Sequence, residues 1–154
     1  MWDELFKLGK DLNVRAGCPN LIERIESGLL SYGNDINSTH NLYEAGLGKF
    51  LSAGISKECL AYDKLTSISN PKKMIKPIEI KGSPIQPITY NSKVTNNLGD
   101  VIGQISSAAW SPDFKVNVAI GMIDRKYWQK SENLFVEIME NDEREIIIKD
   151  KFWS

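Results

Sequence analysis

Arg24 is the residue of this chain whose surroundings most favour ligand binding. The residues three, four and seven positions after it are Ser27, Gly28 and Ser31, all of them small. Residues at these spacings share one face of a helix, so we expect the guanidinium to lie beside a shallow strip that a flat ligand can approach. An arginine offers a planar fork of donors that suits a carboxylate or a polar ring. A surface ion pair with a nearby acid explains the same residues, and helix geometry alone leaves both interpretations open.

The other reactive side chains form no recognisable catalytic or metal-binding set. His40 is the single histidine, which leaves no histidine cluster for a metal and no Ser/His or Cys/His nucleophile pair. Cys18 and Cys59 lie far apart and outside CxxC spacing. Two such isolated thiols are typical of a reduced cytoplasmic protein, with a disulfide between them as the less favoured alternative. We therefore assign no catalytic residue and no metal ligand.

A helix beginning at Leu21 is expected to position Arg24. Asn20 can accept a hydrogen bond from an early backbone N–H, and Glu23 stands where a capping box places its acid. Turned at ~100° per residue, the apolar side chains fall within one arc; they are Leu21, Ile22, Ile25 and Leu29. Gly33 predicts the end of the helix, since glycine adopts the left-handed conformation at little cost.

A boundary is predicted at residues 67–71, where small polar residues precede Pro71. Before it, the pattern predicts a second helix from Ser56 to about Leu65. After it, the hydrophobic period changes from 3.6 residues to 2, which is typical of strands. We therefore divide the chain into a helical region, residues 1–70, and a β domain, residues 71–154.

The β domain is predicted to contain five or six short strands. Their apolar or alternating runs are residues 75–80 (interrupted by Pro77), 88–94, 101–110, 116–122, 134–138 and 145–149. Residues 96–100 give a strong turn signal, and Gly103 marks a bend or bulge. Short strands with turns at this spacing predict a small barrel or sandwich.

Composition excludes several classes of partner. The chain has 154 residues, 42% hydrophobic and 25% charged, which is ordinary for a globular domain. Its net charge of −1 gives no electrostatic reason to bind nucleic acid or an anionic membrane. No apolar run approaches the ~20 residues of a membrane span, and the acidic, amphipathic start is not a signal peptide. We expect a cytoplasmic protein with neither nucleic-acid nor membrane partners.

Two motifs resemble the glycine cleavage T-protein (aminomethyltransferase) superfamily. LIERIESGLLSYGND, residues 21–35, resembles the signature R-L-E-A-G-L-x-x-Y-G-N-D/E, and YEAGLGKF, residues 43–50, resembles P-L-E-A-G-L. The lead-in LFKLGKDLNVRAGCPNLIERIES is more similar to the tetrahydrofolate-dependent dimethylsulfoniopropionate demethylase branch. Ile55, Glu58 and Leu60 retain the family's I-G-R-E-A-L segment. The departures bear on the branch rather than on the fold; they are Leu42, Tyr43, Ser56 and Cys59.

The resemblance implies an α+β fold, in which an N-terminal helical segment, the remnant of the folate-binding domain, precedes a small antiparallel β-barrel. It implies that Arg24 contacts tetrahydrofolate and that Tyr32 lines the same cleft, although a buried structural tyrosine fits equally well. Asp35 and Glu44 lie in the family motifs, but turn-making and capping explain them without chemistry. A basic cluster at positions 72, 73 and 76 could meet a polyglutamate tail of a folate, with a solvated edge as the favoured interpretation.

The family moves a one-carbon unit onto or from N5 of tetrahydrofolate, with dimethylsulfoniopropionate or a lipoyl-bound aminomethyl group as donor. The family's N-terminal portion carries a catalytic aspartate and a pterin-binding glutamate, and neither has a counterpart in these 154 residues. We therefore expect the chain to be inactive alone: a truncated reading frame, an expressed fragment or one subunit of a split enzyme. Its expected partner is a missing N-terminal half or a second copy. The alternatives are a non-catalytic binding or assembly module and a T-protein-like aminomethyltransferase subunit.

Overall fold

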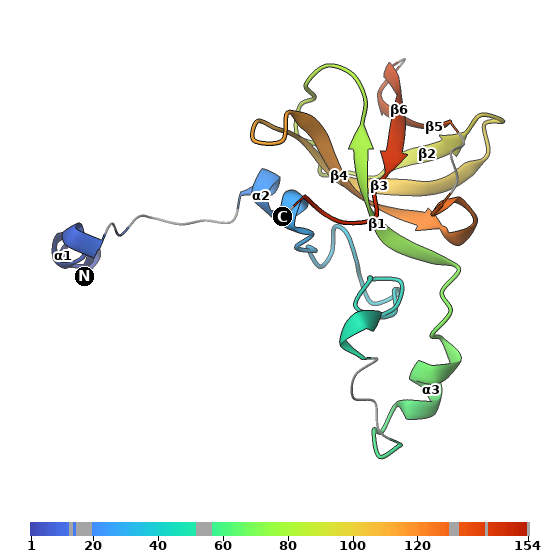
Figure 1. Ribbon diagram of the computed structural model, residues 1–154, viewed down its shortest axis with the longest axis horizontal. Coiled ribbons are helices and arrows are strands. Elements are labelled where there is room, and N and C mark those ends of the chain that lie inside the picture. Colours follow the sequence, from blue (N-terminus) through green and yellow to red (C-terminus); the bar gives the residue numbers. More distant parts are fainter. Residues whose placement is uncertain (13, 15–19, 52–56, 130–132, 141, 154) are drawn as a thin grey trace.

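A computed structural model describes residues 1–12, 14, 20–51, 57–129, 133–140 and 142–153. Most helices occupy the first part of the chain and the strands the second, with one short 3-10 helix between two of the strands (Figure 1). The helical elements are α1 (Trp2–Leu8), η1 (Lys10–Leu12), α2 (Leu21–Ser27), η2 (Gly48–Phe50), α3 (Tyr62–Ser67) and η3 (Arg125–Tyr127). The strands are β1 (Lys73–Ile80), β2 (Ser92–Asn96), β3 (Val101–Ser111), β4 (Val116–Asp124), β5 (Leu134–Met139) and β6 (Asp142–Ile148). None of the helices in these ranges has the length and apolar content needed to cross a bilayer.

The six strands form a closed antiparallel barrel in the order β1-β4-β3-β2-β5-β6 (Figure 1). The pairing of β6 with β1 closes it, with Ile78 opposite Ile148 and Ile80 opposite Ile146. Closure removes the unpaired edges that an open sheet would present. The predicted α+β fold, helices followed by a small antiparallel barrel, is therefore confirmed, and the barrel replaces the sandwich alternative.

The alternating pattern of β4 supplies two separate cores. Ala119 and Ile123 belong to the cluster inside the barrel, which gathers apolar side chains from all six strands. Val118, Ile120 and Met122 face the other way and pack with Ile25 of α2. Because successive side chains of a strand point to opposite faces, one strand contacts both the barrel interior and the helix. The helical segment thus shares a core with the barrel.

The C-terminal segment covers the same outer face. Phe152 and Trp153 pack against the cluster around Ile25, and the Trp153 N–H donates to the Glu26 carbonyl at 2.9 Å. Figure 1 shows the C-terminus beside α2, although the two are far apart in sequence. The helix is therefore held between the barrel wall and the end of the chain.

The helix around Arg24 is shorter than predicted. The capping box is confirmed, since the Glu23 N–H donates to Asn20 Oδ1 at 2.8 Å, but α2 ends at Ser27 and not near Gly33. Gly28 has φ 73° and caps the helix in the left-handed conformation. A Cβ on Gly28 would collide with the Phe152 ring. The earlier glycine therefore ends the helix, and the predicted strip of small residues does not continue as a helix face to Ser31.

The second helix begins later than predicted and overlaps only the end of the predicted range. Instead of beginning at Ser56, which lies outside the described residues, the helix is α3, Tyr62–Ser67. Leu60, which lies within the predicted helix, is fully exposed and precedes α3. A short helix gains most of its stability from packing an apolar face, and the segment before Tyr62 has no such contact at Leu60.

Two strand predictions also needed correction. Pro77 does not interrupt β1, which runs unbroken from Lys73 to Ile80. The Pro77 carbonyl accepts the Lys149 N–H just past the end of β6, and the proline nitrogen points to that same side, so pairing with β4 loses no hydrogen bond. The strand predicted from Ile88 begins instead at Ser92, with Ile88 forming an isolated bridge to Ala108.

The predicted irregularity near Gly103 is confirmed, and β3 contains a second one. The register between β2 and β3 shifts beside Gly103, where a Cβ would collide with the Met122 carbonyl oxygen. Pairing with β4 shifts again between Ile105 and Ser107, leaving Ser106 as the extra residue of a bulge. A bulge redirects side chains that would otherwise alternate.

Replacing Gly28 with alanine should destabilise the protein by about 2–4 kcal/mol, because the backbone is left-handed and the new methyl group meets the Phe152 ring. Gly33→Ala is the matched control: Gly33 also has a positive φ, 91°, but nothing lies near its Cβ position. Its cost should be about 1 kcal/mol, the backbone cost alone. Urea unfolding of both variants measures the difference, and equal losses would contradict the proposed role of Phe152.

Candidate functional site

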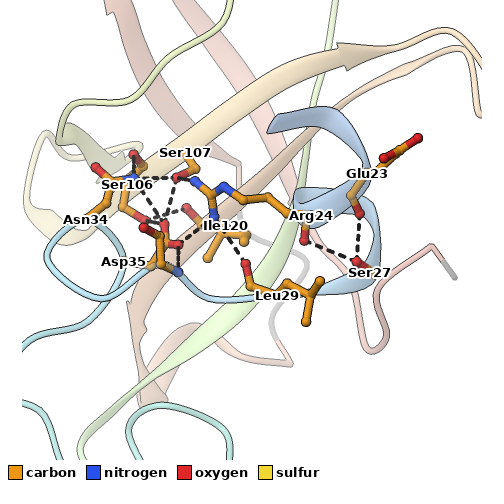
Figure 2. Close-up of polar contacts among 10 residues, drawn as sticks. Glu23, Arg24, Ser27, Leu29, Asn34, Asp35, Ser106, Ser107 and Ile120 are labelled. Carbon is orange, nitrogen blue, oxygen red and sulfur yellow. Dashed lines mark hydrogen bonds and ion pairs between the residues drawn. The ribbon is translucent and has the colours of Figure 1, made fainter. Parts of the chain in front are cut away.

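Arg24 lies at the junction of α2, the turn that follows it and the barrel wall. Its Nη1 donates to Asp35 Oδ2 at 2.7 Å and to the Leu29 carbonyl at 3.2 Å. Its Nη2 donates to Ser107 Oγ of β3 at 2.5 Å. Figure 2 shows the guanidinium pointing away from the helix into this polar cluster. With 15% of its side chain exposed, Arg24 is mostly enclosed by protein rather than lying free on the surface.

The Asp35 carboxylate is the centre of the cluster, and its side chain is completely buried. It accepts hydrogen bonds from the Ser106 hydroxyl at 2.6 Å, the Ser107 hydroxyl at 2.7 Å and the Ser31 N–H at 2.7 Å. A buried carboxylate is costly unless charge and hydrogen bonds compensate it, and here both do. Asp35 therefore has a structural role larger than the turn-making that its motif position predicted.

The bulge in β3 explains how two neighbouring serines reach one carboxylate. In a regular strand, Ser106 and Ser107 would point to opposite faces of the sheet. Because Ser106 is the extra residue of the bulge, both hydroxyls contact Asp35 Oδ1. Asn34 completes the set, since its amide donates to Ser107 Oγ at 2.7 Å and to the Ser106 carbonyl at 3.1 Å. The serines were not singled out from the sequence, where only their small size is visible.

Opposing effects act on the pKa of Asp35. Burial raises the pKa, but hydrogen bonds from Ser106, Ser107 and Ser31 and the positive charge of Arg24 together lower it below its usual value. The carboxylate is therefore ionised at neutral pH and fixes the orientation of the guanidinium.

Tyr32 and Gly33 belong to the turn that carries Asp35. Gly33 has φ 91°, and its N–H donates to the Ile36 carbonyl at 2.7 Å, so this glycine serves the turn and not the helix end. Tyr32 is 73% exposed, in contrast to the buried structural tyrosine considered from the sequence. The structure therefore places Tyr32 on the turn next to Asp35, with its ring facing solvent.

The remaining candidates have local roles. Glu44 forms a capping pair with Asn41: its Oε2 accepts the Asn41 N–H and its own N–H donates to Asn41 Oδ1, both at 3.0 Å. His40 Nδ1 accepts the Asn37 N–H at 3.2 Å. Cys59 is a free, exposed thiol, and Cys18 lies outside the described residues. Among the described residues, no group of three potential metal ligands is present.

A groove of about 680 Å³ begins beside the cluster. Its lining includes Ser27, Gly28 and Leu29 from the end of α2 and residues 74–77 of β1. Leu29 connects the two features, since its carbonyl accepts from Arg24 and the residue lines the groove. Arg24 and Tyr32 are absent from this lining.

Stability should fall in acid because of Asp35. A carboxyl whose pKa is lowered by folding contributes stability above its unfolded pKa of about 3.9, and this contribution is lost as the pH drops through the folded pKa. Asp35→Asn should cost about 3 kcal/mol at pH 7, since it leaves Arg24 without its counter-charge, and much less at pH 3. Urea unfolding between pH 3 and 7 tests this, with Asp113→Asn at the exposed β3–β4 turn as control. Parallel pH profiles for wild type and Asp35→Asn would contradict the expectation.

The comparisons with known proteins agree with this architecture. The chain is 43% identical, over 99% of its length, to a dimethylsulfoniopropionate demethylase from Ruegeria pomeroyi. It is 26% identical, over its whole length, to an aminomethyltransferase from Flavobacterium psychrophilum. It covers 41% and 43% of these relatives, so it spans about two-fifths of their length.

Solved structures and a family model identify the barrel. The crystal structure of glycine cleavage system aminomethyltransferase T from Bartonella henselae superposes with a TM-score of 0.74 over 87% of this chain and 37% of that one, at 19% identity. The family model of the glycine cleavage T-protein C-terminal barrel domain matches residues 75–152, just over half of the chain and nearly all of the barrel. The chain therefore belongs to the glycine cleavage T-protein C-terminal barrel family.

Proposed function

We propose that this chain is the C-terminal portion of a tetrahydrofolate-dependent transferase of methyl or aminomethyl groups. The family match and the two named relatives support this reaction class. The higher identity to the demethylase, 43% against 26%, favours a methyl donor of the dimethylsulfoniopropionate type over an aminomethyl donor. The folate role of Arg24 and the identity of the donor are both part of this proposal.

The observation that carries the proposal is the fixed guanidinium of Arg24. Asp35, Leu29 and Ser107 occupy three of its N–H donors, and its other N–H groups have no partner within the ranges that the structure describes. An arginine held by one carboxylate is pre-organised, so its remaining donors lose little entropy when they bind a polar ring or a second carboxylate. Tyr32, exposed on the adjoining turn, offers an aromatic ring to the same ligand.

Methyl transfer of this kind requires the donor carbon and N5 of the folate to lie in line within a dry cleft. In this proposal the described residues supply an anchor for the folate, and we assign none of them as a catalytic acid or base. In the proposal, the other three-fifths of the relatives' length supplies the opposite wall of the cleft, on the same polypeptide or on a separate one. The 154 residues alone are then inactive, and the reaction takes place in the cytoplasm.

A non-catalytic assembly module is the second candidate. It is favoured by α1, whose apolar side chains Trp2, Leu5 and Leu8 are all more than half exposed. An apolar helix face of this kind suits a protein partner, either the complementary half of the enzyme or a second copy of the chain. Mixing the chain with a separately expressed N-terminal half of a relative distinguishes them: restored methyl transfer supports the enzyme, and binding without transfer supports the module.

Titration calorimetry of tetrahydrofolate into the chain tests the anchor. Wild type should bind, and Arg24→Ala should bind at least about tenfold more weakly, because a charged hydrogen-bonding group is lost. Arg24→Lys keeps a charge for Asp35 but loses the planar fork, so it should retain the fold and still bind more weakly. Melting curves for each variant separate lost binding from lost structure.

Tyr32 allows the same test without touching the buried cluster. Tyr32→Ala should leave the melting temperature unchanged, since the ring is 73% exposed, and weaken folate binding by about threefold to tenfold. Phe114→Ala, at the β3–β4 turn, is the matched aromatic control and should leave binding unchanged. Failure of the wild-type chain to bind tetrahydrofolate would overturn the proposal that these residues form a folate half-site.

A further inference from the structure

The groove that begins at Ser27 continues into a second one. The second has a volume of about 260 Å³ and shares Gly46, Lys49 and Met74 with the first. It extends the concave surface to Arg125 and Trp128, just after β4. The two together form one path, here called the long groove, from the residues beside Arg24 across β1 to η3.

Positive charge dominates the polar part of the long groove. Lys49, Lys76, Lys151 and Arg125 line it, whereas Asp150 is the single carboxylate among the described lining residues. The apolar floor comes from side chains such as Leu29, Leu47 and Phe50. A concave, cation-lined surface attracts a ligand that carries several negative charges.

At the end of the long groove near η3, two cationic side chains lie against the ring of Trp128. Lys76 Nζ lies 4.8 Å from the centre of its ring, and the Arg125 guanidinium carbon lies 5.7 Å from it. The indole N–H donates to the Ile123 carbonyl at 2.8 Å, which fixes the ring. Neither Lys76 nor Arg125 makes an ion pair with another described residue. Burial lowers the pKa of Lys76 and the nearby Asp150 opposes that shift, so this amine sits in a partly desolvated site that an anion would stabilise.

We propose that the long groove binds the oligo-γ-glutamate tail of the folate, with Lys76 and Arg125 contacting its carboxylates. This inference rests on the proposed function, because it extends the ligand from the Arg24 anchor along the adjoining surface. An oligo-γ-glutamate tail is an extended chain that carries several carboxylates. The long groove is complementary to it in charge, since its lining includes four cationic side chains and one acidic one. It refines the earlier interpretation of the basic cluster: Lys76 lines the long groove, and Lys72 and Lys73 do not.

Tri-γ-glutamate, a peptide without a pterin, tests the long groove directly. Calorimetry with the full chain should show binding that weakens as salt rises, because exposed charge pairs are screened. Lys76→Gln and Arg125→Gln should each weaken binding by about threefold to fivefold. Lys93→Gln, on the exposed side of β2, removes the same charge elsewhere and should change nothing. Absence of binding, or an equal loss with Lys93→Gln, would overturn the proposal.

Comparing tetrahydrofolate with its triglutamate form separates this inference from the proposed function. The longer ligand should bind about tenfold more tightly, and Lys76→Gln should remove most of that gain while leaving the monoglutamate unaffected. Equal affinities for both ligands would overturn the tail site while the folate anchor stands. Binding of the free peptide without binding of either folate would overturn the folate anchor and, with it, the assignment of the long groove to a folate tail.

Discussion

The buried carboxylate of Asp35 is the constraint on which the rest of this structure depends. A charge with no solvent contact must be matched by donors, and here they come from three places: Arg24 on α2, Ser31 in the turn and two serines of β3. These three places are different elements of the chain, and the two serines share one of them, β3. Removing any one of them leaves the carboxylate undercompensated, so the helix, the turn and the barrel wall are fixed relative to one another (Figure 2).

That constraint links local irregularities that look unrelated in the sequence. The bulge at Ser106 turns two hydroxyls toward one acid, and the left-handed Gly28 ends α2 where the Leu29 carbonyl can reach Arg24. The absent side chain of Gly28 also admits the Phe152 ring, which brings the C-terminal segment onto the helix. Gly28 and Phe152, which meet at this contact, both line the start of the long groove. The site proposed for folate is therefore built from the contacts that join the helical segment to the barrel.

Much of the fold follows from the sequence by local rules. The capping box at Asn20 and Glu23, the alternation in β4 and β5 and the turn at Asn96 all correspond to observed elements, because each depends on neighbours in the chain. The end of α2 was misplaced because two glycines were available and the choice between them depends on Phe152, more than a hundred residues away. The serine pair could not be found locally either, since a bulge is defined by the register with a partner strand. For Arg24, the sequence left an ion pair and a ligand open; the structure shows the ion pair and leaves other donors for the proposed ligand.

A double-mutant cycle between Asp35→Asn and Ser107→Ala tests the central claim most directly. If the carboxylate joins the turn to the barrel, the two substitutions disturb one interaction, and their costs measured by urea unfolding at pH 7 should fall short of additivity by about 1–2 kcal/mol. Ser111→Ala, another buried serine of β3 that does not contact Asp35, should be additive with Asp35→Asn. Additivity of Asp35→Asn with Ser107→Ala, within about 0.5 kcal/mol, would contradict the account.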